Sequence, residues 1–192
     1  SEGGPEKVGD VLQLYQQALK AATPTRVSPN SHNALMTAGF CHEDPKVIDG
    51  RATELIGWYS DQQRERARLV WQGVDPATVP PDYQGYYERD MKLAAGPHPG
   101  DATAAETVKR GTSFCVGTPD QCIEFFERYE AMGVEQVFLL SAIGPASHEE
   151  VMNTLTMFGK YVIPHFRAKE KVQAQHSNSM TAAANGSTEE VL

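Results

Sequence analysis

Two apolar runs, each flanked by helical patterns, constrain the fold of this chain more than any other feature. The first is the uninterrupted run Ala34 to Cys41, and the second is the apolar centre of "EQVFLLSAI". Runs of this length are typical of strands buried on both faces of a parallel sheet. Because helical patterns alternate with them, the sequence predicts parallel βα units and an α/β fold.

Residues with strong start and stop preferences bound the helical patterns. A long helix is predicted to begin at Asp44 and Pro45, to continue through Trp71 and to stop at Gly73. Its apolar face is formed by Ile48, Ala52, Leu55, Ile56 and Tyr59. A first helix is predicted to begin at Pro5, with its apolar face at Val8, Val11, Leu12, Tyr15 and Leu19.

The C-terminal third predicts two further capped helices. Thr118 and Gln121 form a capping box, and Gly133 is a stop signal. The buried face of this helix is predicted to consist of Cys122, Phe125, Phe126, Tyr129 and Met132. Ser147 caps a last helix, which Pro164 is predicted to end, and Val151, Leu155, Phe158 and Val162 are predicted to line its buried face.

Only two strands are convincing, and two parallel strands alone cannot bury both faces or satisfy their edges. The chain is therefore predicted to be a fragment, or to complete its sheet with strands from elsewhere. The first residues, "SEGGPEKVGD", lack an initiator Met, which favours a chain that begins partway through a longer protein. They also lack the basic and apolar regions of a signal peptide.

Two segments stand apart from the βα pattern. Residues 74–112 contain five prolines and three tyrosines, with short helical patches near 83–94 and 102–110. An irregular segment of this length within a domain is usually a lid or a linker, and we predict a lid-like insertion. Residues 169–192 are polar and small, which predicts a disordered tail.

Composition narrows the classes of partner. The net charge of −8 and pI of about 5.2 disfavour nucleic-acid binding. No apolar run has the length of a membrane span. Three cysteines without paired spacing argue against a disulfide framework and favour a reducing, cytoplasmic compartment. Cys115 and Cys122 lack metal-site spacing, and no metal site is predicted.

Residues 116–166 resemble the C-terminal end of the bacterial-luciferase-like monooxygenases, which are flavin-dependent (β/α)8 barrels. The residues that carry the resemblance are Gly117, Thr118, Pro119, Gly133, Val134, Glu135, the strand from Val137 to Leu140, Gly144, Pro145, His148, Glu149 and Pro164. Residues 3–115 are similar to the family in pattern and order more than in identity. The resemblance implies that residues 1–168 are the last βα units of a partial (β/α)8 TIM barrel.

The resemblance also implies an activity and a cofactor. Family members bind reduced FMN, often supplied by a separate flavin reductase, and oxidise a small organic substrate with O2. Others use the deazaflavin F420 and transfer hydride. The full-length protein is expected to be a homo-oligomeric enzyme, whereas this chain alone is expected to be unstable and to retain no flavin. Substrate and flavin are expected at the carboxyl ends of the strands, as in barrel enzymes generally.

Two residues are candidates for cofactor binding at those strand ends. His42 follows the first predicted strand, and Ser141 ends the second. Each also has a purely structural interpretation, because His42 stands at a helix entry and Ser141 is a small residue that ends a strand. Catalytic residues are not identified, since most flavin-contacting positions of the family would lie on strands that precede this chain.

Tyr83, Tyr86 and Tyr87 are candidates for stacking on the flavin ring within the lid-like insertion. The alternative is that they anchor this insertion to the rest of the fold. The chain lacks a P-loop, a G-x-G-x-x-G fingerprint and a G-x-S-x-G elbow, which disfavours a dinucleotide-binding dehydrogenase or a serine hydrolase. Open alternatives are a non-catalytic truncated barrel subunit and another (β/α)8 enzyme with a generic last unit.

Overall fold

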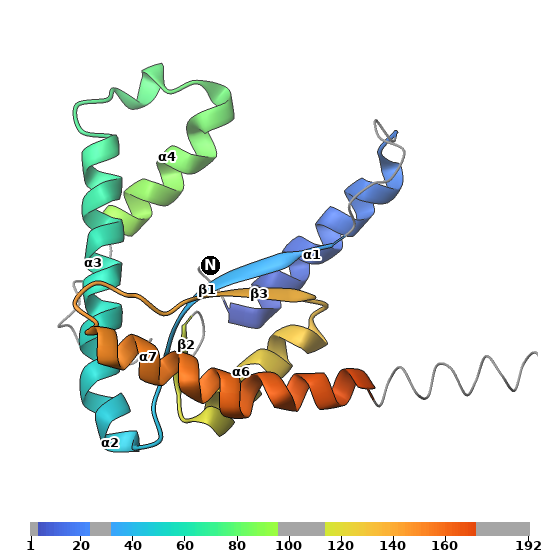
Figure 1. The fold of residues 1–192 in the computed structure, drawn as a ribbon. Coiled ribbons are helices and arrows are strands. Elements are labelled where there is room, and N and C mark those ends of the chain that lie inside the picture. The colour runs from blue at the N-terminus through green and yellow to red at the C-terminus, as the bar shows by residue number, and fades with distance from the viewer. Residues whose placement is uncertain (1–3, 24–31, 96–113, 172–192) are drawn as a thin grey trace, which may run out of the picture.

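The computed structural model describes residues 4–23, 32–95 and 114–171 (Figure 1). Three parallel strands form one sheet in the order β2-β1-β3, with β1 spanning Ala34–Cys41, β2 Cys115–Gly117 and β3 Gln136–Leu140. β1 pairs with β3 from Ala34↔Gln136 to Ala38↔Leu140, and with β2 from Gly39↔Cys115 to Cys41↔Gly117. The two predicted strands are confirmed, whereas β2, which has only three residues, was not predicted.

The helices follow the predicted order. They are α1 (Gly4–Ala21), α2 (Pro45–Val47), α3 (Thr53–Val70), α4 (Pro81–Ala94), α6 (Pro119–Ala131) and α7 (His148–Met157). A π turn, η1 (Ile48–Ala52), joins α2 to α3, and a 3-10 turn, η2 (Pro76–Thr78), precedes α4. A second π turn, η3 (Phe158–Val162), follows α7, and the helix then continues to residue 171.

Two hydrophobic clusters lie on opposite faces of the sheet, because successive residues of a strand point to opposite faces. Leu35 and Cys41 of β1 belong to a cluster with α1, α6, α7 and η3. Ala38 and Phe40 of β1 belong to a cluster with η1, α3 and Ile143. Helices therefore pack on both faces of the sheet.

Helices on both faces are a feature of open parallel sheets. In a closed (β/α)8 barrel the helices form an outer ring and the inner face is packed by strand side chains alone. The described part of the chain therefore shows a small, mixed α/β structure with a parallel sheet, and it does not by itself show the barrel that the resemblance implies.

One sheet face is covered only in part. Met36 and Phe138 are direct register partners on β1 and β3, and their side chains are 65% and 56% exposed. They lie on the same face as Ala38 and Phe40, which are buried under η1 and α3. Among the residues that the structure describes, the covering helices thus reach the carboxyl half of this face and leave its amino half exposed, beside the unpaired edge of β3.

The helix caps that the sequence predicts are formed in the structure. Thr118 and Gln121 form a capping box at α6, as do Ser147 and Glu150 at α7. Asp44 caps α2 by accepting a hydrogen bond from the Lys46 N–H. The predicted faces of the long helix and of α6 are buried, apart from Tyr59, which is partly buried, and Met132, which is 40% exposed at the end of α6.

The structure corrects the prediction that Pro164 ends the last helix. Proline lacks an N–H and its ring clashes with the carbonyl four residues earlier in a regular α-helix. Here the π turn η3 lies directly before it, and the Ile163 N–H reaches back to the Phe158 carbonyl. We attribute the passage of the helix through Pro164 to this wider turn. Residues 169–171 are helical, and residues 172–192 lie outside the described residues.

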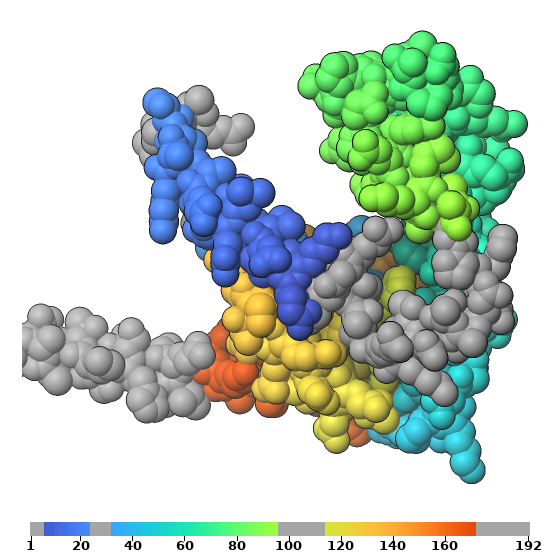
Figure 2. All heavy atoms as spheres, turned by 180° about the vertical axis from the view of Figure 1, so that it is seen from behind, coloured from blue at the N-terminus to red at the C-terminus, as the bar shows by residue number. Residues whose placement is uncertain are grey.

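The buried face of the last helix also differs from the prediction. Thr154, Met157, Phe158 and Val162 are buried, whereas Leu155 is 45% exposed. On α1, Val8 and Leu12 pack against the core, but Val11 and Tyr15 are exposed. Seen from behind, α1 and the hairpin of α3 and α4 project from the body as two separate arms (Figure 2).

Candidate functional site

The carboxyl edge of the sheet brings together the residues that follow the three strands. Ligands of parallel α/β sheets bind at this edge. Because Cys41 pairs with Gly117, His42 and Thr118 follow at the same level, and the His42 N–H donates to the Gly117 carbonyl at 3.3 Å. Ala38 pairs with Leu140, so Ser141 lies level with Gly39, three residues or about 10 Å short of His42 along the strand direction. His42 and Ser141 share the edge but are not adjacent.

His42 has a defined orientation. Its Nδ1 accepts a hydrogen bond from the Asp44 N–H at 2.9 Å, and its ring is half-buried. In a neutral imidazole this places the remaining hydrogen on Nε2, which is then a donor for a ligand oxygen. The Asp44 carboxylate is itself engaged, because it accepts from the Lys46 N–H. The contact with the Asp44 N–H therefore gives His42 the structural role of a helix-entry residue and fixes the orientation of its ring.

Tyr161 supplies a second polar contact beside this edge. Its hydroxyl donates to the Glu43 carboxylate at 3.1 Å, and the Lys160 ammonium lies 4.8 Å from the centre of its ring. The contact with Tyr161 raises the pKa of Lys160. Sequence reasoning did not find Tyr161, because it lies 118 positions from Glu43 and only the packing of η3 against the end of β1 brings them together.

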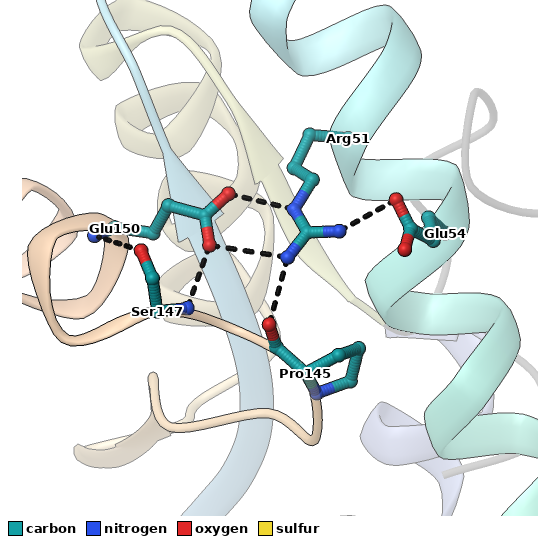
Figure 3. A network of polar contacts seen from close by, with 5 residues as sticks. All are labelled: Arg51, Glu54, Pro145, Ser147 and Glu150. Atoms are coloured by element: carbon teal, nitrogen blue, oxygen red, sulfur yellow. Dashed lines mark hydrogen bonds and ion pairs between the residues drawn. The ribbon is translucent and has the colours of Figure 1, made fainter.

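A network centred on Arg51 fixes the loop that follows β3 (Figure 3). The Arg51 guanidinium donates to both oxygens of Glu150, at 2.6 and 3.2 Å, and to the Pro145 carbonyl at 2.7 Å. It also pairs with Glu54 at 2.5 Å. The hydrogen bond from Arg51, followed by that from Ser147, lowers the pKa of Glu150 to about 2. The hydrogen bonds to Glu150 and Glu54 raise the pKa of Arg51.

The same loop is packed against α3 at Gly144. This residue has φ +47°, and a Cβ there would lie only 2.1 Å from Cε3 of Trp58. A glycine is needed both for the left-handed backbone and for the close approach of the indole. Arg51 and Trp58 together hold residues 144–147 in one arrangement at the carboxyl side of the sheet.

The three tyrosine candidates lie elsewhere. The ring of Tyr87 packs edge-on against Trp71 at 5.2 Å, and Tyr83 and Tyr86 are more than half exposed on α4. Trp71 caps the end of the 18-residue helix α3, so these rings lie about 27 Å along the helix from its start. The described structure does not bring them together with His42 or Ser141. The remainder of the predicted lid, residues 96–112, lies outside the described residues.

The α3–α4 hairpin is held by a buried carboxylate. Asp90 is 3% exposed and accepts from the Trp71 indole N–H at 3.0 Å and from Arg89 at 2.7 Å. Burial opposes its charge, yet the hydrogen bonds from Arg89 and Trp71 keep its pKa below the usual value. Tyr87 belongs to the same packing, through its edge-on contact with the Trp71 ring.

All three cysteines are buried on one side of the sheet, at Cys41, Cys115 and Cys122. The Cys122 thiol donates to the Gly117 carbonyl at 3.8 Å. Contact with Cys122, together with burial, raises the pKa of Cys41, so its thiol stays protonated. Within residues 4–23, 32–95 and 114–171, no group of three His, Cys, Asp or Glu side chains could hold a metal ion.

Neither of two surface hollows coincides with the carboxyl edge. One of about 320 Å³ lies at the opposite, amino edge of the sheet, between Lys20, Asn33 and Met132. Another of about 550 Å³ lies on the α3–α4 hairpin, where Arg64 and Arg68 are each paired with an acidic side chain. No helix within the described residues is long and apolar enough to cross a membrane.

Comparisons with known proteins give matches at the level of structure alone. No family model and no curated protein matches the chain. The crystal structure of monooxygenase RslO1 from Streptomyces bottropensis is 20% identical and has a TM-score of 0.46, over 86% of this chain and 40% of that chain. The coenzyme F420-dependent tetrahydromethanopterin reductase from Methanopyrus kandleri is 20% identical with a TM-score of 0.44, over 85% of this chain and 43% of that chain.

Both of these enzymes are oxidoreductases by their names. At 20% identity and TM-scores below 0.5, the likeness assigns neither a family nor an activity to this chain. In both comparisons the chain spans less than half of the length of the protein that it matches.

Proposed function

We propose that this chain is the C-terminal part of a flavin-dependent oxidoreductase of the luciferase-like family, which oxidises a small organic substrate with O2 and reduced FMN. The observation that carries the proposal is the family-like sequence pattern of residues 116–166. Several of its positions have a distinct structural role. Thr118 begins a capping box, and Gly133 and Gly144 adopt positive φ angles of 92° and 47° on either side of β3.

The incomplete sheet supports the proposal that further strands belong to the functional protein. All-parallel sheets are ordinarily covered on both faces. Here Met36 and Phe138 are exposed on one face, and within the described residues no strand pairs with the outer side of β3. β3 itself has the apolar centre Val137 to Leu140, without the charges or proline that protect a natural sheet edge. Additional parallel strands would cover both features.

The residues at the carboxyl edge fit a flavin only in part. The Nε2–H of His42 could donate to a phosphate oxygen, and the Ser141 hydroxyl could hydrogen-bond a ligand. The aromatic rings of Tyr83, Tyr86 and Tyr87 lie at the far end of α3 and are not placed to stack on a ring held at this edge. Most of the flavin site is therefore proposed to come from strands that this chain does not contain.

When bound, the flavin would supply the redox chemistry, with a separate reductase providing the reduced form. In this proposal the described residues have binding and scaffolding roles. His42 and Ser141 contribute hydrogen bonds at the edge, and Arg51 and Trp58 hold the loop after β3 in place. The expected homo-oligomer and the lid role of residues 74–112 are parts of the same proposal.

The test compares residues 1–192 with a longer polypeptide that includes the in-frame coding sequence upstream. Both would be titrated with FMN and with F420 by equilibrium dialysis and fluorescence. We expect the longer protein to retain FMN and the chain alone to retain none. Retention of F420 instead of FMN would favour an F420-dependent hydride-transfer enzyme over the proposed monooxygenase. Retention of neither by the longer protein would favour a non-catalytic subunit.

A matched pair of histidines tests the carboxyl edge. In the longer protein, His42→Ala is expected to weaken flavin binding by roughly 10- to 150-fold, because one charge-assisted hydrogen bond contributes about 1.5–3 kcal/mol. His32→Ala is the control, since His32 precedes the same strand at its amino edge and is paired with Glu135. Equal affinity of both variants for flavin would exclude His42 from the site. Tight FMN binding by residues 1–192 alone, together with a cooperative unfolding transition, would contradict the proposal that this chain is part of a larger enzyme.

A further inference from the structure

We draw no further inference here: the strongest candidate, the uncovered sheet face around Met36 and Phe138 beside the free edge of β3, carries nothing beyond the proposal above, because nothing in the structure shows what covers it.

Discussion

Gly144 shows how a single residue sets the geometry of the loop after β3. Its φ of +47° lies in the region that L-residues rarely adopt, and the Trp58 indole occupies the place where a side chain would begin. Gly133 has a comparable backbone, with φ +92°, but nothing lies within 4 Å of its Cβ position. The two glycines therefore separate the effect of backbone strain from the effect of the clash.

We predict that Gly144→Ala lowers the free energy of unfolding by about 2–5 kcal/mol, as the sum of left-handed strain and overpacking. Gly133→Ala is the control and is expected to lower it by about 1–2 kcal/mol, from strain alone. The measurement is the urea midpoint of the longer polypeptide, followed by circular dichroism. Adding Trp58→Ala to Gly144→Ala should relieve the clash, and equal losses for the two single glycine variants would show that Trp58 does not restrict this position.

Glu150 is a second residue with two roles, one as a charge and one in a helix cap, that can be measured separately. It forms both the capping box with Ser147 and the ion pair with Arg51, and its pKa is lowered from 4.5 to about 2. Because the pKa of Glu150 is lower in the folded state than in the unfolded state, its carboxylate stabilises the fold at pH values above the unfolded-state pKa. This contribution is lost as the pH falls from about 5 towards 2.

Glu150→Gln retains an acceptor for the cap but removes the charge. We predict a loss of about 1–2 kcal/mol at pH 7, allowing for the partial exposure of the pair. The difference from the wild-type chain should shrink as the pH is lowered to about 2–3. Glu149→Gln, at an exposed neighbouring position, is the control. A loss at pH 7 that persists unchanged at pH 3 would indicate that the ion pair is not its source.

At the scale of elements, the hairpin of α3 and α4 depends on one buried carboxylate. The side chains of Trp71, Tyr87 and Asp90 form its centre, whereas the outer faces of both helices are largely exposed. Because α4 packs mainly on α3, it should open without disturbing the sheet, since local stability follows local packing.

Asp90→Ala is therefore expected to loosen α4 selectively. Removing the acceptor of the Trp71 indole and the partner of Arg89 should destabilise the hairpin by about 2–3 kcal/mol. Hydrogen exchange of residues 81–94 should accelerate, while β1 and β3 remain unchanged. Asp90→Asn keeps an acceptor for Trp71 and should have a smaller effect, and Asp82→Ala, on the exposed first turn of α4, should cost no more than about 1 kcal/mol. Accelerated exchange in β1 as well would mean that hairpin and sheet unfold together.

At the scale of the whole molecule, the exposed pair Met36 and Phe138 distinguishes a complete fold from a partial one. A large apolar side chain that is 56% exposed contributes little to the stability of the chain alone. If further parallel strands cover this face in the longer polypeptide, the same side chain becomes part of a core.

Phe138→Lys is thus predicted to have little effect on the structure of residues 1–192 and a large effect on the stability of the longer polypeptide. In residues 1–192 it should leave the far-ultraviolet circular dichroism nearly unchanged and reduce the binding of an apolar dye. In the longer polypeptide it should cost several kcal/mol, because a charge is buried without a partner. Tyr83→Lys, at an equally exposed position on α4, is the control for both. A small effect of Phe138→Lys in the longer polypeptide would show that this face stays exposed there.

Much of the local structure follows from the sequence. Thr118, Ser147 and Asp44 cap helices where expected, because caps depend on hydrogen bonds within a few residues. The faces of α3 and α6 follow from helical periodicity. Local signals did not predict that the last helix continues through Pro164, where a π turn accommodates the proline. They also did not predict β2, because three residues are too few to show an alternating pattern.

The candidate site depends on contacts that no local pattern encodes. The order β2-β1-β3 decides that His42 lies level with Thr118 and that Ser141 lies lower on the edge. Arg51 meets Glu150 across 99 positions, and Tyr161 meets Glu43 across 118. The sequence by itself determined the caps, most of the faces of α3 and α6 and the two main strands, because these rest on neighbours in the chain. The tertiary structure alone decided which side chains share the carboxyl edge, that helices cover both faces of the sheet, and that part of one face remains open, because these result from packing between distant segments.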